Sequence, residues 1–209
     1  MNKPFSQACE NNKKPILDIL IKVFDKNKHV LEIGSGTGQH AVFFGQHLPH
    51  LIWQTSDLLI NHQGINWWLD ESVCTNVEKP IICDLKKDWP VPKQELRIDG
   101  IYTANTLHII SWELVIKFFD GLAKELTAQA TVCIYGPFNY QGKYTSESNA
   151  NFDVWLKDRD INSGIRDIEA IMLLANSAGL QLIDDHLMPA KNRLLVTSGF
   201  VSLLTLLGH

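Results

Sequence analysis

Cysteines are few in this 209-residue chain, and their spacing gives them no structural role. The four stand at positions 9, 74, 83 and 133 and form no Cys-x-x-Cys pair, which argues against a zinc site and against a regular disulfide framework. We therefore expect reduced thiols and no bound metal. The first residues also lack the apolar stretch of a secretory signal, so a cytoplasmic location is expected.

Long hydrophobic runs and an excess of basic charge are missing as well. The longest late apolar stretch, residues 200–207, is much shorter than the roughly 20 residues that cross a bilayer. Lys and Arg total 19 against 23 Asp and Glu, a formal net charge of −4, which does not provide the broad basic surface of a duplex-binding protein. Neither a membrane nor nucleic acid is an expected partner, and the oligomeric state is left open.

Length and composition predict one globular domain over residues 1–209. A typical domain has roughly 100–200 residues, and 45% hydrophobic with 20% charged residues is an ordinary globular balance. Within this domain, residues 1–28 are expected to form an N-terminal helical segment. Residues 198–209 are expected to form a tail, to which we assign no role.

Short apolar runs alternate with amphipathic stretches along the chain. The runs predict strands at residues 30–33, 51–56, 80–83, 98–104, 131–135, 180–184 and 193–197. The amphipathic stretches predict helices at residues 39–48, 111–126, 149–157 and 167–178, one around Trp67 and Trp68, and a first helix with Pro15 in its first turn. This alternation requires crossover connections, so the predicted fold class is α/β, with a mostly parallel sheet covered on both faces. The last two strands should pair antiparallel.

A glycine-rich loop, Gly34-Ser35-Gly36-Thr37-Gly38, follows the first predicted strand. Glycines let the backbone approach a ligand closely, although a tight strand-to-helix turn uses them too. The third glycine comes one residue earlier than in the dinucleotide fingerprint G-x-G-x-x-G. Glu32 also places a negative charge where a pyrophosphate would lie. That charge repels phosphate and suits a cation.

Polar residues end the next three predicted strands. Asp57 could accept hydrogen bonds from both hydroxyls of a ribose, or cap a helix. Asp84 could accept from an adenine amine with Leu85 against the ring, or close a turn, and Asn105 is placed for the rest of the ligand or for a substrate. Because the carboxyl ends of parallel strands meet at one edge of the sheet, one ligand should touch all of them. A cationic end, a ribose and an adenine without phosphate describe S-adenosylmethionine (SAM).

Further sequence blocks extend well beyond the glycine loop. They are Ser6-x-Ala8-Cys9-Glu10, Asn12-Lys13-x-Pro15-Ile16-Leu17, residues 31–41 (LEIGSGTGQHA), Trp53-Gln54-x-Ser56-Asp57, residues 136–140 (GPFNY), residues 144–149 (YTSESN), Phe152-Asp153-x-Trp155-Leu156, residues 163–167 (SGIRD) and Met188-Pro189-Ala190-x-Asn192-Arg193. With these blocks the chain resembles the DUF938 family, the methyltransferase-like 26 proteins, within the class I SAM-dependent methyltransferases. The resemblance runs from residue 6 to about residue 197.

The resemblance implies a Rossmann-like class I methyltransferase fold, with a seven-stranded, mostly parallel sheet, helices on both faces and an antiparallel last strand. It also implies SAM as the cofactor, but it supplies no acceptor. Asn11 departs from the family pattern, which has arginine at this position. If that arginine contacts the carboxylate of SAM, Lys13 would have to supply the contact here.

Candidate residues for the acceptor follow the fourth and fifth predicted strands. The stretch from Gly136 to Phe152 is rich in aromatic side chains, so we expect it to line a substrate crevice rather than only to cover the sheet. The expected contacts are Asn139, Tyr140, Tyr144, Glu147, Asn149 and Phe152. His108 and Tyr140 are the candidates for catalysis, although the apolar neighbours of His108 are more typical of a packed core histidine.

The sequence therefore predicts a SAM-dependent methyltransferase that acts by direct in-line transfer on an unidentified small-molecule acceptor. A peptide or protein acceptor, a non-catalytic SAM-binding protein and a nicotinamide-dependent oxidoreductase are the alternatives. The residues expected to bind SAM are Glu32, Gly34, Ser35, Gly36, Gly38, Asp57, Asp84, Leu85 and Asn105.

Overall fold

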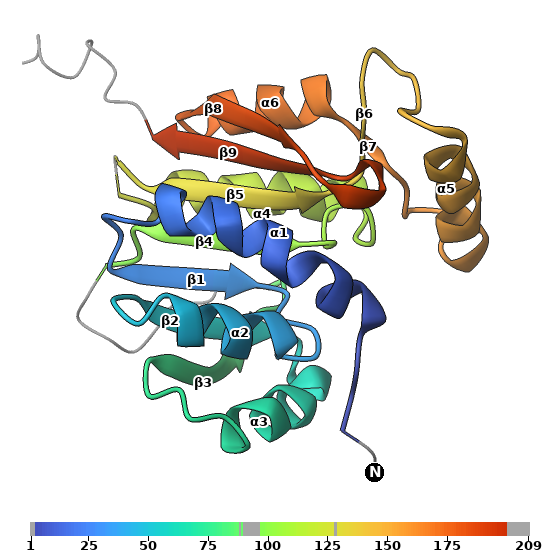
Figure 1. Cartoon of the computed structure of the whole chain (residues 1–209). Helices are drawn as coiled ribbons and strands as arrows, with labels where there is room; N and C mark the ends of the chain where they lie inside the picture. Colours follow the sequence, from blue (N-terminus) through green and yellow to red (C-terminus); the bar gives the residue numbers. More distant parts are fainter. Residues whose placement is uncertain (1–2, 88, 90–96, 128, 200–209) are drawn as a thin grey trace, which may run out of the picture.

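A seven-stranded sheet forms the centre of the computed structural model, which describes residues 3–87, 89, 97–127 and 129–199 (Figure 1). Its strand order is β3-β2-β1-β4-β5-β9-β8. The strands are β1 (His29–Ile33), β2 (Ile52–Asp57), β3 (Val77–Ile82), β4 (Gly100–Ala104), β5 (Thr131–Gly136), β8 (Leu180–Leu187) and β9 (Arg193–Gly199). The five strands from β3 to β5 pair in parallel, and β9 pairs antiparallel with both β5 and β8.

Helices cover both faces of this sheet. One face carries α1 (Gln7–Val23) and α2 (Gln39–His47), and the other carries α4 (Trp112–Glu125) and α6 (Ile168–Ser177) (Figure 1). Along β1, Val30 packs toward α1 and α2, whereas Leu31 and Ile33 pack toward α4 and α6. Successive side chains of a strand point to opposite faces, so this short run supplies both cores. The predicted fold class is confirmed.

The chain changes direction around β1, which places a ligand-binding edge there. From β1 the chain crosses to β2 on one side, and β4 lies on the other side. In open α/β sheets, ligands bind outside the carboxyl ends of the strands at such a switch point. On the β2 side, the short helix η1 (Leu59–Asn61) leads into α3 (His62–Asp70), which lies beside α2.

Helix α1 begins well before the position that the sequence predicts. Ser6 caps it by accepting a hydrogen bond from the backbone N of Cys9 at 3.3 Å, so Pro15 lies inside the helix rather than in its first turn. The residues before Ile16 are mostly polar, which hid these first turns from a search for apolar periodicity. As a result, α1 reaches past the carboxyl edge of the sheet.

Between β5 and α6 the chain leaves the sheet. Helix α5 (Glu147–Arg159) stands beyond the carboxyl ends of the parallel strands (Figure 1). It is flanked by two short parallel strands that the sequence did not predict, β6 (Phe138–Asn139) and β7 (Arg166–Asp167). The short helix η2 (Pro189–Lys191) joins β8 to β9.

Several sequence boundaries need correction: β4 begins at Gly100 rather than at residue 98, β8 runs to Leu187 rather than to residue 184, and α5 spans Glu147–Arg159 rather than residues 149–157. β3 begins at Val77 rather than at residue 80, because its first residues pair with Trp53 and Gln54 of β2. Ser198 and Gly199, expected in the tail, complete β9 through pairing with β5 and β8. Residues 200–209 lie outside the described residues.

Three further expectations from composition concern cysteines, metals and membranes. Cys9, Cys74, Cys83 and Cys133 are free thiols. Within the described ranges, no cluster of three or more His, Cys, Asp or Glu side chains is arranged to hold a metal ion. Among the helices that the structure describes, none has both the length and the apolarity to cross a bilayer.

Candidate functional site

The carboxyl ends of the central strands border a cavity of about 690 Å³, which we call the first cavity. Its wall is formed by the loops after β1, β2, β3 and β4 together with the start of α1. Of the residues expected to bind SAM, all but Gly38 line it: Glu32, Gly34, Ser35, Gly36, Asp57, Asp84, Leu85 and Asn105. The acidic side chains after the separate strands therefore face one shared cavity.

The glycine loop has backbone angles that side chains rarely adopt. Gly34 has φ +77°, and a Cβ there would lie 2.8 Å from Oγ1 of Thr106. Gly36 has φ +59°, and among the described residues no atom lies within 4 Å of the position that a Cβ would take. Gly38 serves another purpose: it precedes α2, and a Cβ there would lie 3.1 Å from the Cα of Ile65 in α3. Gly38 thus allows helix packing and lies away from the cavity.

Asp57 is held rigidly at the end of β2. The backbone N of Gly36 donates to its Oδ2 at 2.6 Å, and the backbone N of Leu58 and Nδ2 of Asn61 each donate to its Oδ1 at 2.7 Å. These hydrogen bonds fix the carboxylate against the glycine loop. A fixed acceptor is suited to a ligand with two neighbouring hydroxyl donors.

Asp84 closes a turn, which is one of the two roles that the sequence left open. Its Oδ1 accepts from the backbone N of Lys86 at 3.1 Å, which closes the turn after β3, and its Oδ2 lies 3.7 Å from Nζ of Lys87. The same residue and Leu85 also line the first cavity. A carboxylate and an apolar side chain thus lie next to each other where the loop after β3 borders the first cavity.

Glu32 is the buried charge of the first cavity. Burial raises the pKa of its carboxyl to about 7, although hydrogen bonds from Trp53 and Ser35 oppose that rise, and the Asp57 charge adds to it. Nε1 of Trp53 donates to its Oε2 at 3.1 Å. A carboxyl that is only partly ionised at neutral pH becomes fully ionised when a cation binds beside it.

Asn105 stands between the first cavity and a second cavity of about 890 Å³. It has φ +55°, and its backbone N donates to the carbonyl O of Tyr135 at 2.8 Å. Ser6 and Ile109 also line both cavities. The two cavities therefore meet at the end of β4, beneath the start of α1.

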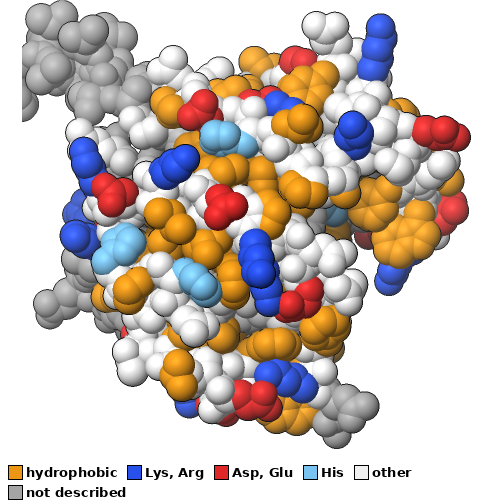
Figure 2. All heavy atoms as spheres, in the orientation of Figure 1, with side chains coloured by type: hydrophobic (Ala, Val, Ile, Leu, Met, Phe, Trp, Pro, Cys, Tyr) orange, Lys and Arg blue, Asp and Glu red, His pale blue; other side chains and the backbone are white. Residues whose placement is uncertain are grey.

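One face of α5 lines the second cavity. The residues on this face recur every three or four positions, as expected for a helix: Ser148, Asn149, Phe152, Trp155, Leu156 and Arg159. The rings of Phe152 and Trp155 stack with centroids 5.6 Å apart and an angle of 18°. Figure 2 shows hydrophobic side chains gathered where Figure 1 draws α5, and Val154 and Trp155 are exposed there.

His108 lines the second cavity. It is only 4% exposed, and its ring lies edge-on to Phe152 at 5.5 Å. Burial, with a smaller effect from the Arg166 charge, lowers its pKa to about 4. The imidazole is therefore packed, as its apolar neighbours indicated, and it is neutral at pH 7.

Four of the expected acceptor contacts lie elsewhere. The structure brings Asn149 and Phe152 to the second cavity, but not Asn139, Tyr140, Tyr144 or Glu147. The hydroxyl of Tyr140 donates to Oδ2 of Asp185 on β8 at 2.7 Å, so the structure gives no support to a catalytic role.

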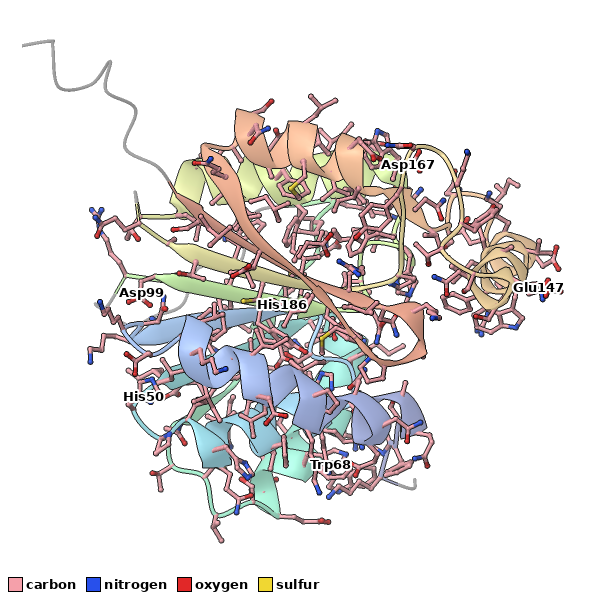
Figure 3. The ribbon with its side chains drawn as sticks, turned by 45° about the horizontal axis from the view of Figure 1, so that its top comes forward. His50, Trp68, Asp99, Glu147, Asp167 and His186 are labelled. Atoms are coloured by element: carbon pink, nitrogen blue, oxygen red, sulfur yellow. The ribbon has the colours of Figure 1, made fainter. Side chains whose placement is uncertain are left out.

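The other three, Asn139, Tyr144 and Glu147, also lie outside the lining of the second cavity. The hydroxyl of Tyr144 donates to Oδ2 of Asp153 at 2.7 Å. Asn139 belongs to β6, where it pairs with Asp167 of β7. Glu147 lies in the first turn of α5, at the far end of the molecule (Figure 3). The loop from Gly136 thus folds back on itself before α5 begins.

Several residues of the second cavity were missed by the search of strand ends. Asn12, Pro137, Ser163 and Asn192 line it, as does Tyr135 at the end of β5. A signal for most of them existed, because the sequence blocks behind the family resemblance contain all but Tyr135. The later blocks are not required by the sheet, and residues from 136–140, 144–149, 152–156, 163–167 and 188–193 line this cavity.

Solved methyltransferases have the same fold. An O-methyltransferase family protein from Burkholderia thailandensis gives a TM-score of 0.75 at 15% identity, covering 91% of this chain and 57% of that one. An O-methyltransferase family 2 protein from Planctomyces limnophilus, solved with apigenin, gives 0.79 at 16%, covering 91% and 57%. Human N-acetylserotonin methyltransferase, solved with SAM, gives 0.71 at 12%, covering 90% and 55%.

These likenesses establish the Rossmann-like methyltransferase fold. The chain spans little more than half the length of these structures, and at such identities the likeness extends to the fold alone. The family is established by sequence. A family model described as "Protein of unknown function (DUF938)" matches residues 3–198, nearly the whole chain, and the protein therefore belongs to the DUF938 family.

Proposed function

We propose that this protein binds SAM in the first cavity and transfers its methyl group to a small molecule in the second. The observation that carries this proposal is the junction of the two cavities at Ser6, Asn105 and Ile109. A cofactor and an acceptor can lie side by side there. Volumes of about 690 and 890 Å³ fall within the range of roughly 300–1,000 Å³ typical of small-molecule sites.

The first cavity offers a partner for each part of SAM. Glu32 faces the positively charged methionine end, and Gly34 and Gly36 let the backbone approach it. Asp57 accepts from the ribose hydroxyls, and Asp84 accepts from the adenine amine while Leu85 contacts the ring. The human relative with this fold was solved with SAM, which supports the same cofactor here.

Methyl transfer needs only alignment of the two reactants and a group that accepts the proton released by the acceptor. A lone pair of the acceptor attacks the methyl carbon, the carbon–sulfur bond breaks, and its electron pair stays on sulfur, giving S-adenosylhomocysteine. Alignment of the two reactants supplies effective molarities of about 10⁵–10⁸ M. For a hydroxyl acceptor, the neutral imidazole of His108 can take the released proton and pass it to water.

The size of the second cavity, about 890 Å³, favours a small molecule over a peptide or protein acceptor. A structural relative solved with apigenin points in the same direction. A non-catalytic SAM-binding protein is the second candidate, since the structure gives His108 a strongly lowered pKa and thus weak basicity. The single-domain organisation and the cytoplasmic location stay predictions.

The first test is calorimetric titration of the protein with SAM, S-adenosylhomocysteine and NADH. SAM and S-adenosylhomocysteine should bind and NADH should not, because Glu32 disfavours the pyrophosphate. Incubation with methyl-labelled SAM and a metabolite extract should then yield one labelled product that depends on the protein. Failure of SAM to bind, or tighter binding of NADH, would overturn the proposal, and SAM binding without any labelled product would favour the non-catalytic candidate.

A further inference from the structure

The hydroxyl of Tyr135 accepts a hydrogen bond and still has its own proton to donate. Tyr135, the last residue but one of β5, is 3% exposed and lines the second cavity. Nδ2 of Asn192 donates to its hydroxyl at 3.0 Å. Burial raises the pKa of the phenol, although the nearby side chains of Asn12 and Asn192 oppose that rise, so the hydroxyl keeps its proton.

The orientation of the Asn12 side-chain amide is set by His40, to which its oxygen is hydrogen-bonded. His40 is buried, and burial lowers its pKa to about 4, so the ring is neutral with one N–H. Nε2 of His40 lies 2.7 Å from Oδ1 of Asn12, and Nδ1 lies 3.2 Å from the hydroxyl of Tyr102. Because an amide oxygen only accepts, Nε2 carries the ring proton and donates to Asn12, and the hydroxyl of Tyr102 donates to the unprotonated Nδ1.

With its oxygen turned to His40, Asn12 presents its NH₂ group to Tyr135. Both amide neighbours of the Tyr135 hydroxyl, Asn12 and Asn192, are then donors, and neither can accept its proton. A phenol oxygen accepts from two donors and still donates once. The cavity is the direction left for that proton, so a ligand there meets a hydrogen-bond donor.

Another part of the lining of the second cavity is aromatic. Phe152, Trp155 and His108 contact one another in series there, and Trp155 is 49% exposed despite lying on the cavity face of α5. The guanidinium of Arg159 lies 4.6 Å from the Trp155 ring, and the neighbouring carboxylate of Asp160 lines the same cavity. This wall presents flat apolar surface together with one positive and one negative side chain.

We propose that the acceptor is a flat aromatic carboxylate or carbonyl compound, whose ring packs against Phe152 and Trp155 and whose oxygen accepts the Tyr135 hydrogen bond. This deepens the proposed function, on which its description as an acceptor rests. Within that function, Tyr135 is a residue that determines specificity by hydrogen bonding. The aromatic wall supplies most of the contact area, and the Tyr135 hydroxyl supplies the hydrogen bond that selects an oxygen acceptor.

The test is binding of three probes to the full-length protein with S-adenosylhomocysteine, measured by calorimetry. 1-Hydroxy-2-naphthoate carries both the ring and the carboxylate, 1-naphthol carries the ring alone, and decahydro-2-naphthoate carries the carboxylate alone. The first probe should bind at least about 10-fold more tightly than either of the others, as expected for losing one hydrogen bond to a charged group or an aromatic contact.

Two variants separate the contributions. Tyr135→Phe should weaken 1-hydroxy-2-naphthoate by about 10-fold and leave 1-naphthol within about 2-fold. Trp155→Leu should weaken both aromatic probes and spare decahydro-2-naphthoate. Tyr144→Phe and Val154→Leu are matched controls, because the first hydroxyl binds Asp153 and the second side chain is exposed outside the cavity lining. Thermal unfolding curves confirm that each variant is folded.

Three results would overturn the inference: equal binding of the saturated probe, equal weakening of the two aromatic probes by Tyr135→Phe, or no binding of any probe. If S-adenosylhomocysteine itself does not bind, the proposed function fails, while probe titrations without it still decide the chemistry of the second cavity. The two failures are therefore distinguishable.

Discussion

The two cavities are built from different kinds of structure. The first is lined by loops that each directly follow a parallel strand, and its polar groups are tied to the backbone, as Asp57 is by Gly36 and Leu58. The second adds the first turns of α1, one face of α5 and the turn between β8 and β9 to the ends of β4 and β5. A site built on strand ends comes with the fold, whereas a site built on added segments belongs to one family.

The largest effect on SAM affinity is expected from a substitution in the glycine loop. It should be confined to ligand binding in the first cavity. Gly34→Ala adds a Cβ 2.8 Å from Thr106 at φ +77°, so SAM affinity should fall by about 100-fold or more, measured by calorimetry. Gly142→Ala is the matched control, since Gly142 has φ +69° and no neighbour near the added Cβ. Equal SAM affinities in the two variants would contradict a close approach of the cofactor to Gly34.

Asp57 should come next in the same cavity. Asp57→Ala removes a charged hydrogen-bond acceptor and should weaken SAM by about 1–3 kcal/mol. Asp185→Ala serves as the control, because that carboxylate binds Tyr140 and Arg193 outside both cavities. Calorimetry on folded protein measures both. An unchanged affinity in Asp57→Ala would mean that the ribose lies elsewhere.

The pH dependence of SAM binding tests Glu32. Burial raises its pKa to about 7 in the free protein, and a bound cation favours the ionised carboxyl, so binding should release a proton below that pH. SAM affinity should therefore rise by up to about 10-fold from pH 6 to pH 8 and then level off. Titration in two buffers of different ionisation enthalpy counts the protons. Glu32→Gln should abolish this dependence, and its persistence would assign it to another group.

The smallest effect on SAM binding is expected at Tyr140, which lines neither of the two cavities. Tyr140→Phe removes only the hydrogen bond to Asp185, so SAM binding should change by less than about 2-fold and the free energy of unfolding by roughly 1 kcal/mol. Denaturant unfolding and calorimetry measure the two quantities. Loss of methyl transfer with SAM binding retained would restore the catalytic role that the sequence suggested.

Much of the first cavity could be predicted because its residues follow from local pattern. An apolar run that ends in Gly34, or in Asp57, identifies the carboxyl end of a strand, and parallel pairing brings such ends together. Gly38 is the exception. Its spacing resembled that of a ligand-binding glycine, but only the position of Ile65 on a different helix shows that it is needed for packing.

The amino-acid sequence by itself determined the fold class, the family and most of the first cavity, because strand ends and glycine spacing are local features. Tertiary structure decided which residues meet in the second cavity, of which the search of the sequence had suggested only Asn105, His108, Asn149 and Phe152. Asn12, Tyr135 and Asn192 lie far apart in the chain and meet only because α1 crosses the sheet edge and β9 pairs with β5. The same holds for Tyr140, whose hydroxyl could only be placed once β8 brought Asp185 beside it. Hydrogen-bond partners across such separations leave no periodic trace in the sequence.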